Sequence, residues 1–349
     1  MSQSPVFSGK LRERGLPGLY DLGKIWNPSW FQGNREKKNY FEGWYIKLVD
    51  ATGNHTWSFI PGVSLNQEDH HAFIQVINGK TGDTWYFRFP ADSFVFSKND
   101  FRVQIGNNEI THNHINLDLK SPEGLFQGEV SFPGQTPLKA TLLRPGIMGW
   151  YRYAPFMECY HGVVSMDHHL EGRLNLNGPV VDFSNGKGYM EKDWGTSMPE
   201  TWIWMQSNHF HEDSTSFMLS VANVPWLGKS FPGFLGFFLY KGRKHLFATY
   251  NRAKITRLER NGHLLFMTLE RKDLHLEIRG EQGKTIPGKK NSAGALKAPQ
   301  QGQMNRVIHE NLDASLHIAV RHKSGNLLFE GTGRHAGLEM IGDVSTLRP

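Results

Sequence analysis

The chain has 349 residues, of which 38% are hydrophobic and 21% charged, and its formal net charge is +6. This composition is typical of a globular protein with one large or two ordinary domains. The Lys and Arg residues are scattered without a long basic run, so we expect no nucleic-acid partner. A single cysteine, Cys159, excludes an internal disulfide. Aromatic residues make up 12% of the chain and include 10 Trp, which indicates that some of them contact a ligand.

Two features bear on the location of the protein. The first fifteen residues, Met1 to Gly15, contain no apolar stretch of signal-peptide length. No run in the chain approaches the ~18 apolar residues that a spanning helix requires. We therefore expect a cytoplasmic protein. Its mildly basic charge also leaves open peripheral contact with an anionic membrane.

Residues 1–37 show neither a helical nor a strand period and are predicted to form an irregular N-terminal arm. Short strand patterns bounded by Gly, Asn, Asp or Pro follow, and prolines accumulate between residues 133 and 156. The pattern predicts an all-β, antiparallel fold with two barrel-like halves, at 38–150 and 151–349. Within the second half we expect a long mobile loop at 281–304 and a short helix at 304–312. The predicted strands are 41–49, 54–63, 70–78, 83–89, 101–106, 114–119, 125–132, 157–166, 169–176, 179–183, 186–192, 201–210, 215–224, 233–240, 244–250, 253–260, 263–270, 273–279, 314–322 and 326–333.

The stretch from Gly186 to Phe210 concentrates chemically useful side chains. Glu191 and Asp193 lie one residue apart, so in an extended chain they share a face and each could raise the pKa of the other. If 201–210 is a strand, alternation places a mixed set of aromatic and amide side chains on one face. Such a mixture is typical of a ligand cavity. The set is Trp202, Trp204, Gln206 and Asn208.

Four motifs together resemble the tocopherol cyclase family, over roughly residues 38–342. The four motifs are Tyr40-Phe41-Glu42-Gly43-Trp44-Tyr45, Tyr189-Met190-Glu191-Lys192-Asp193-Trp194-Gly195, Trp202-Ile203-Trp204-Met205-Gln206-Ser207-Asn208 and Leu296-Lys297-Ala298-Pro299. The resemblance implies two lipocalin-like β-barrel halves in tandem and closure of a chromanol ring from a prenylated hydroquinone. Part of the pattern is similar to carotenoid hydratases. Plant cyclases usually carry Asn where this chain has Asp193.

Chromanol closure requires an acid for the alkene, stabilisation of a tertiary cation and a base for the phenol. A carboxylic acid in a dry aromatic pocket keeps its proton near neutral pH, and aromatic faces stabilise the cation. Since the reaction is an isomerisation, it needs no cofactor. The catalytic candidates are Asp193, Glu191 and Glu42. Expected contacts to the hydrophobic substrate come from Trp44, Tyr45, His161, Trp194, Trp202, Trp204, Gln206 and Asn208, with His161 also a candidate phenol base.

Other functions remain open at this point. A carrier of a hydrophobic quinone or isoprenoid would use the same cavity without turnover, and a hydratase would add water to the alkene. A metal site has weaker support, because His112 with His114, and His209 with His211, form pairs without a third ligand. We therefore predict no bound metal. Oligomeric state and tail length of the substrate do not follow from the sequence.

Overall fold

A computed structural model describes residues 22–33, 38–98, 100–154, 157–226, 229–283 and 294–348. Most of the predicted N-terminal arm lies outside these ranges. Its described part, 22–33, carries no strand.

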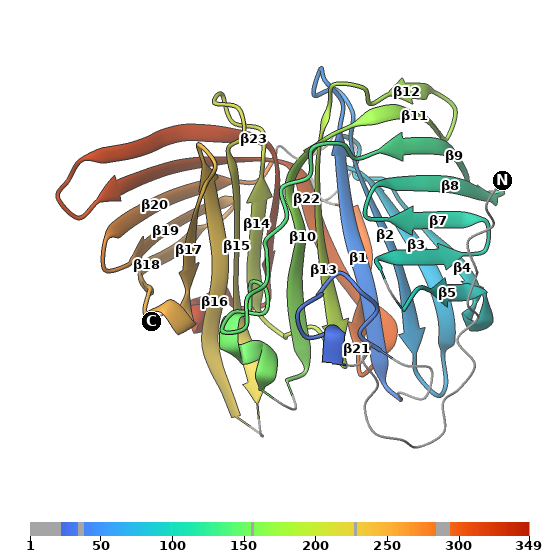
Figure 1. Cartoon of the computed structure of the whole chain (residues 1–349), viewed down its shortest axis with the longest axis horizontal. Helices are drawn as coiled ribbons and strands as arrows, with labels where there is room; N and C mark the ends of the chain where they lie inside the picture. The colour runs from blue at the N-terminus through green and yellow to red at the C-terminus, as the bar shows by residue number, and fades with distance from the viewer. Residues whose placement is uncertain are drawn as a thin grey trace.

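The half of the molecule on the right in Figure 1 contains two antiparallel sheets that face each other. The six-stranded sheet has the order β10-β13-β1-β2-β3-β4, and the seven-stranded sheet has the order β12-β11-β9-β8-β7-β6-β5. These strands are β1 (Tyr40–Val49), β2 (Thr56–Leu65), β3 (His70–Asn78), β4 (Thr84–Pro90), β5 (Phe94–Phe96), β6 (Arg102–Ile105), β7 (Asn108–Thr111), β8 (His114–Ser121), β9 (Gly124–Ser131), β10 (Cys159–His169), β11 (Glu171–Leu176), β12 (Val180–Asp182) and β13 (Lys187–Gly195).

The other half is one large curved sheet with the order β17-β16-β15-β14-β23-β22-β20-β19-β18, to which β21 adds by pairing with β22. Its strands are β14 (Trp202–Ser207), β15 (Ser216–Trp226), β16 (Lys229–Tyr240), β17 (Arg243–Ala248), β18 (Lys254–Asn261), β19 (Leu264–Glu270), β20 (Leu274–Glu281), β21 (Gly294–Gln300), β22 (Gln303–His322) and β23 (Leu327–Ile341). Four short 3-10 helices complete the described elements: η1 (Ala91–Ser93), η2 (Gly149–Tyr153), η3 (Thr249–Asn251) and η4 (Val344–Leu347).

Three apolar cores follow from the strand period of two. One lies between the two sheets of the first half, and a second lies inside the curved sheet of the second half. A third core joins the halves and includes Tyr45, Trp202 and Trp204. β14 shows the alternation clearly, because Ile203 and Met205 enter the core of the second half while the two tryptophans face the first half.

The predicted all-β, antiparallel fold with two lipocalin-like halves is confirmed. Within the described ranges, the first and last strands of each sheet are not paired with each other, so the sheets curve without closing into full barrels. A hairpin at Asn261-Gly262 joins β18 to β19, and Gly262 adopts the positive φ of 59° that the turn requires.

Two predictions in the second half were wrong. Residues 304–312 are part of the 20-residue strand β22 and not a helix, and 294–300 form β21 and not a loop. The central part of the predicted loop, 284–293, lies outside the described residues. Pairing explains both errors, because β21 bonds to β22 and also to Gln75 of β3, whose side chain bonds both backbone groups of Lys297. Strand structure here depends on tertiary contacts that cannot be predicted from the polar local sequence.

Strands β10 to β13 belong to the sheets of the first half, although they follow residue 150. The division between sheets therefore falls between β13 and β14, and the domain boundary at 150/151 stays a prediction. Among the described residues, the structure contains no helix with the length and apolar character needed to cross a membrane.

Candidate functional site

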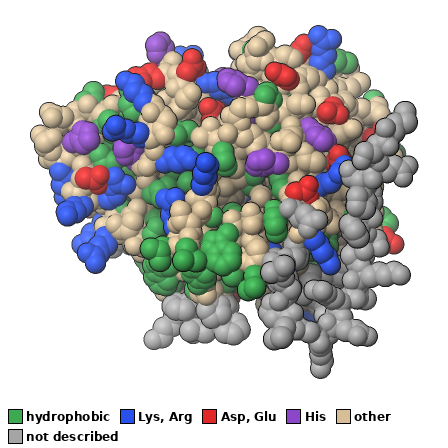
Figure 2. Space-filling model, in the orientation of Figure 1, with side chains coloured by type: hydrophobic (Ala, Val, Ile, Leu, Met, Phe, Trp, Pro, Cys, Tyr) green, Lys and Arg blue, Asp and Glu red, His purple; other side chains and the backbone are tan. Residues whose placement is uncertain are grey.

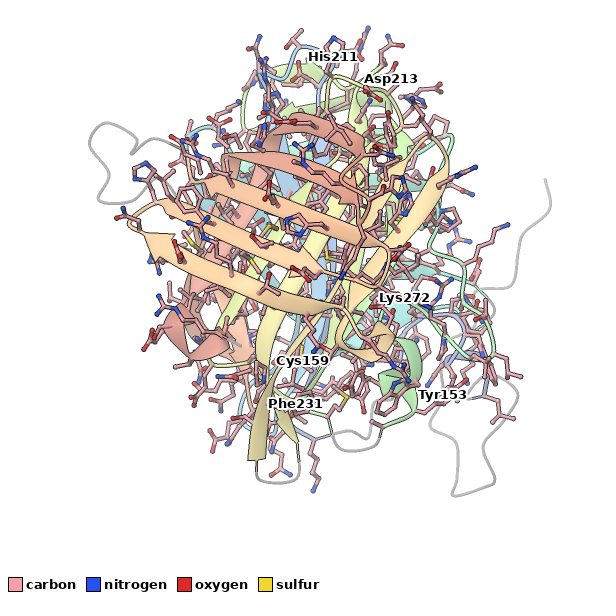
Figure 3. All side chains as sticks on the ribbon, turned by 90° about the vertical axis from the view of Figure 1, so that its left-hand side faces the viewer. Tyr153, Cys159, His211, Asp213, Phe231 and Lys272 are labelled. Atoms are coloured by element: carbon pink, nitrogen blue, oxygen red, sulfur yellow. The ribbon has the colours of Figure 1, made fainter. Side chains whose placement is uncertain are left out.

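A cavity of about 210 Å³ lies where the two halves meet. Its walls come from β1, β2, β3, β10 and β13 of the first half and from β14, β15, β16, β21, β22 and β23 of the second. Figure 3 labels Cys159 and Phe231, which line the cavity, at the end of the molecule away from His211 and Asp213. Apolar and aromatic side chains dominate the lining, and the ionisable ones are His161, Glu191, Asp193, Lys297, Glu310 and Glu339, with Tyr45, Tyr151, Tyr160, Tyr250 and Cys159.

The register of three neighbouring strands builds the first charged group. β13 lies between β10 and β1, with His161 opposite Asp193 on one side and Tyr45 opposite Glu191 on the other. Strand alternation then directs Glu191 and Asp193 to the cavity. Gly195 ends β13 with φ 151°, and a Cβ there would lie 2.0 Å from the Glu158 carbonyl oxygen. Only glycine allows the chain to leave the sheet at this point.

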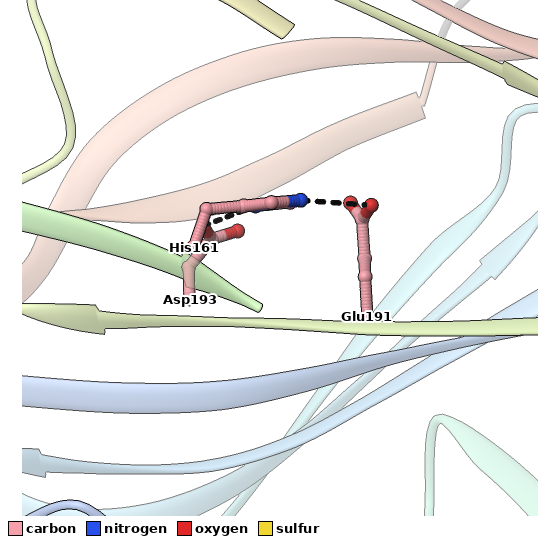
Figure 4. Close-up of side chains that lie close together, drawn as sticks. All are labelled: His161, Glu191 and Asp193. Carbon is pink, nitrogen blue, oxygen red and sulfur yellow. Dashed lines mark hydrogen bonds and ion pairs between the residues drawn. The ribbon is translucent and has the colours of Figure 1, made fainter. Parts of the chain in front are cut away.

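His161 lies between the two carboxylates of β13 (Figure 4). Its Nδ1–H donates to Asp193 Oδ1 over 2.8 Å. Its Nε2 lies 3.3 Å from Glu191 Oε2, an ion-pair contact without hydrogen-bond geometry. Tyr189 donates its hydroxyl to the same Glu191 oxygen over 2.5 Å. The cluster therefore fixes one imidazole and two carboxylates inside the cavity.

The electrostatics of this cluster favour an imidazolium. Burial alone would lower the pKa of His161, whose side chain is 11% exposed. The negative charges of Asp193 and Glu191 and the hydrogen bond to Asp193 outweigh burial and raise that pKa to about 10. The three ligand atoms lie within 4.8 Å of one another, close enough to share one metal ion. A proton held on the imidazole accounts for the same geometry, because it pairs both carboxylates.

Two more carboxyls line the cavity from the second half. Glu310 is on β22 and accepts the Tyr45 hydroxyl at 2.5 Å, and Glu339 is on β23 and accepts the indole N–H of Trp202 at 2.6 Å. Burial raises the pKa of Glu310 to about 7. Burial, and then the charge of Glu310, raise the pKa of Glu339 well above its usual range.

Glu42 lies on the other face of β1, away from the cavity. It forms an ion pair of 2.6 Å with Lys192, and both side chains are fully buried. The backbone N–H groups of Gln32 and Gly33 and the hydroxyl of Tyr40 also donate to it. These bonds attach the described part of the N-terminal arm to β1, which is a structural arrangement.

The structure brings together part of the predicted binding set. Tyr45, His161, Trp202 and Trp204 line the cavity with Glu191 and Asp193. Other members of the set lie elsewhere. Trp44 and Trp194 enclose the Lys192 ammonium, with ring centroids 4.8 Å from Nζ.

Gln206 and Asn208 lie beyond the cavity, between the halves. Gln206 accepts a hydrogen bond of 2.9 Å from Lys47, and Asn208 donates to Asp167 and to the Gly188 carbonyl. Through these hydrogen bonds, the two amides connect β14 and the residue that follows it to strands of the first half.

Sequence reasoning missed Glu310, Glu339 and Lys47. A signal for Glu310 existed, because Ile308, Glu310 and Leu312 alternate, which in a strand places one carboxyl in an apolar face. Glu339 likewise follows the strand pattern beyond residue 333, where the predicted strand ended. The motif residues 296–299 were recognised only by resemblance, and all four line the cavity.

The fold and the site define a class: a β-rich protein with acid–base groups in an apolar interior cavity. The profile of the tocopherol cyclase-like family matches residues 135–342, and the chain belongs to this family. Over 74 residues it is 31% identical to the "Probable tocopherol cyclase, chloroplastic" of Oryza sativa subsp. japonica and to the "Tocopherol cyclase, chloroplastic" of Zea mays. These matches cover 21% of this chain, which spans 16% of the length of either curated relative.

Solved structures show the same fold. The crystal structure of CghA with Sch210972 covers 87% of this chain and 89% of its own, with a TM-score of 0.54 and 9% identity. At this identity the likeness concerns the fold alone.

Proposed function

We propose that this protein is an acid–base enzyme that protonates the alkene of a prenylated hydroquinone and closes a chromanol-type ring. The observation that carries the proposal is the cavity between the halves, where aromatic walls surround the His161–Glu191–Asp193 cluster. Membership of the tocopherol cyclase-like family supports an enzyme of this general kind. The substrate itself is part of the proposal.

The walls suit the cationic intermediate. Trp202, Trp204 and Tyr45 line the cavity, and the Tyr45 and Trp204 rings meet edge to face at 5.3 Å. Aromatic faces attract a cation by about 2 kcal/mol each when desolvated. A dry wall also keeps water from the cation, so the substrate's own phenol is the nucleophile available to it.

The charged cluster suits the head group. Its two carboxylates outnumber the single imidazolium, so it accepts hydrogen bonds from phenolic hydroxyls. When the phenol oxygen attacks the cation, its proton becomes strongly acidic, and Asp193 or Glu191 can receive it. Asp193 is the more exposed of the two carboxyls and so offers a path back to solvent. Glu42, which pairs with Lys192 on the other face, has no role in this scheme.

The decisive experiment compares turnover with binding. Glu191→Gln and Asp193→Asn should each lower turnover of a prenylated hydroquinone by about 100-fold or more, while tryptophan quenching shows nearly unchanged binding. Asp213→Asn is the matched control, since that side chain is 95% exposed and lies at the other end of the molecule. If the wild type binds such ligands tightly but converts none, the protein is a carrier.

We also propose contact with a membrane beside the cavity. Large apolar side chains are exposed around η2, with Leu143 at 86%. In this region Figure 2 shows hydrophobic side chains gathered below Lys and Arg residues. η2 also contributes Tyr151 to the cavity lining. The exposed apolar side chains are Leu142, Leu143, Trp150 and Tyr153.

Three cations near these side chains indicate an anionic bilayer as the partner. Burial lowers the pKa of Lys244, and the nearby positive charges of Lys139 and Arg144 lower it further. Each cation near an anionic surface contributes about 1 kcal/mol. The wild type should therefore float with vesicles that contain anionic lipid, and the double variant Leu142→Ser/Leu143→Ser should float several-fold less. Equal flotation of both proteins would contradict this part of the proposal.

A further inference from the structure

Glu310 and Glu339 lie on neighbouring strands, next to a paired position. Asn311 of β22 pairs with Leu338 of β23, and Glu310 and Glu339 are the residues adjacent to these two. The charge of Glu310 acts on Glu339. Both carboxyls are buried and line the cavity. Two like charges in this position would repel each other strongly.

The groups around the pair come from four further strands. β1 contributes Tyr45 and Lys47, β13 contributes Glu191 and Asp193, and β14 contributes Trp202. β10 contributes His161, which already pairs with the carboxylates of β13.

In the described part of the chain, Lys47 is the cation that acts on the pair. The charge of Lys47 lowers the pKa of Glu310, while the charge of Glu191 raises it. Lys47 is itself fully buried, and burial lowers its own pKa to about 7. One buried cation cannot neutralise two neighbouring buried carboxylates, so the pair retains a proton at neutral pH.

Hydrogen bonds distinguish the two members. Tyr45 donates a hydrogen bond to Glu310, which fits an ionised carboxylate at Glu310. The Tyr45 hydroxyl keeps its proton because burial raises its pKa well above the usual value. Trp202 donates to Oε2 of Glu339, which leaves Oε1 of that residue to carry the proton. The same indole is part of the aromatic wall, so the proton lies beside the surface expected to stabilise a cation.

We propose that the Glu310–Glu339 pair is the proton donor to the substrate alkene, with Glu339 as the member that transfers the proton. This inference rests on the proposed function. The O–H bond of Glu339 breaks, and the alkene π electrons form the new C–H bond, which leaves a tertiary cation. The phenol oxygen then forms the C–O bond and loses its proton to the His161–Glu191–Asp193 cluster. That cluster returns a proton to Glu339, directly or through water, so no oxidant or second substrate is consumed.

Three variants of the full-length protein test the assignment. Glu339→Gln and Glu310→Gln keep shape and hydrogen bonding but remove the shared proton, whereas Glu330→Gln is the control on the exposed part of β23. With a prenylated hydroquinone as substrate, kcat should fall by about 100-fold or more in Glu339→Gln, with KM nearly unchanged. Glu310→Gln should also lose activity and should shift the alkaline limb of the pH–rate profile. Glu330→Gln should match the wild type in both quantities.

A substrate-independent measurement accompanies the kinetics. Infrared difference spectra between neutral and alkaline pH should show the carbonyl stretch of a protonated carboxyl in the wild type and in Glu330→Gln, but not in Glu339→Gln. Full activity in Glu339→Gln would overturn the donor role while leaving the proposed function intact. Absence of turnover by the wild type, with the band present, would overturn the proposed function and the donor role with it. Absence of the band in the wild type would refute the shared proton.

Discussion

Replacing His161 by Gln removes the positive charge that lies between Glu191 and Asp193 and should destabilise the fold. The pKa of His161 is about 10 in the folded protein and about 6.5 in an unfolded chain. At pH 7 most of this pKa difference stabilises the folded protein, and its contribution to the free energy of unfolding is about 4 kcal/mol. Removing one partner of a buried ion pair costs about 3–5 kcal/mol in general, a range that includes this value.

The pH dependence gives this prediction its sign. Because the folded pKa is raised, the contribution is fully present below about pH 6.5 and is lost as pH rises through about 10. Urea unfolding should therefore show a deficit of about 4 kcal/mol for His161→Gln at pH 7, and a much smaller one above pH 10.

The chain offers a matched control for this variant. His275 also lies between two carboxylates, with Nε2 3.2 Å from Glu277 and Nδ1 3.9 Å from Glu270, but it is 31% exposed. His275→Gln should change the unfolding free energy by less than about 1 kcal/mol, since water screens exposed pairs. If both variants lose the same small amount at pH 7, the buried imidazolium is not what holds the cluster together.

Three further predictions address other parts of the molecule. Lys192→Met leaves Glu42 buried without its cation and should lower the unfolding free energy by about 3–5 kcal/mol, measured in urea; the double variant Glu42→Gln/Lys192→Met should lose less, and an additive loss would argue against the pair. Turnover should fall as the pH rises into the alkaline range, because the pKa of the donor Glu339 is raised well above its usual value by burial and by the charge of Glu310; a rate that stays flat over the whole alkaline range contradicts a carboxyl donor. Chelators should leave turnover unchanged, and metal analysis should find no stoichiometric zinc, iron or copper; one tightly bound equivalent would instead assign His161, Glu191 and Asp193 to a metal.

The fold was predictable to the extent that strand patterns are local. Turn residues and alternation identified most strands, and the spacing of Glu191 and Asp193 placed both on the cavity face. Register is not local, and it decides which partners meet. The pairing of β10 with β13 sets His161 opposite Asp193, so the sequence prediction of two mutually perturbed carboxyls lacked the cation between them.

The same limit explains Glu42 and the second carboxyl pair. Glu42 and Trp44 share a face of β1, but that face turns toward the core of the first half and Lys192 and not toward the cavity. Glu310 was predicted to lie in a short helix, and Glu339 lies beyond the end of the predicted strand 326–333, so only the pairing of β22 with β23 reveals that they are neighbours. Charge pairs across strands of distant sequence need a three-dimensional register before they can be recognised.

Turnover in deuterium oxide tests the central claim most directly. Wild-type protein is incubated with a prenylated hydroquinone whose alkene is intact, and the product is analysed by mass spectrometry and NMR. If the cavity protonates the alkene and the phenol closes the ring, the product is an isomer of the substrate with one carbon-bound deuterium next to the new C–O bond. Product that is heavier by one water identifies a hydratase, and substrate recovered unchanged, while it still quenches the tryptophan fluorescence, contradicts catalysis altogether.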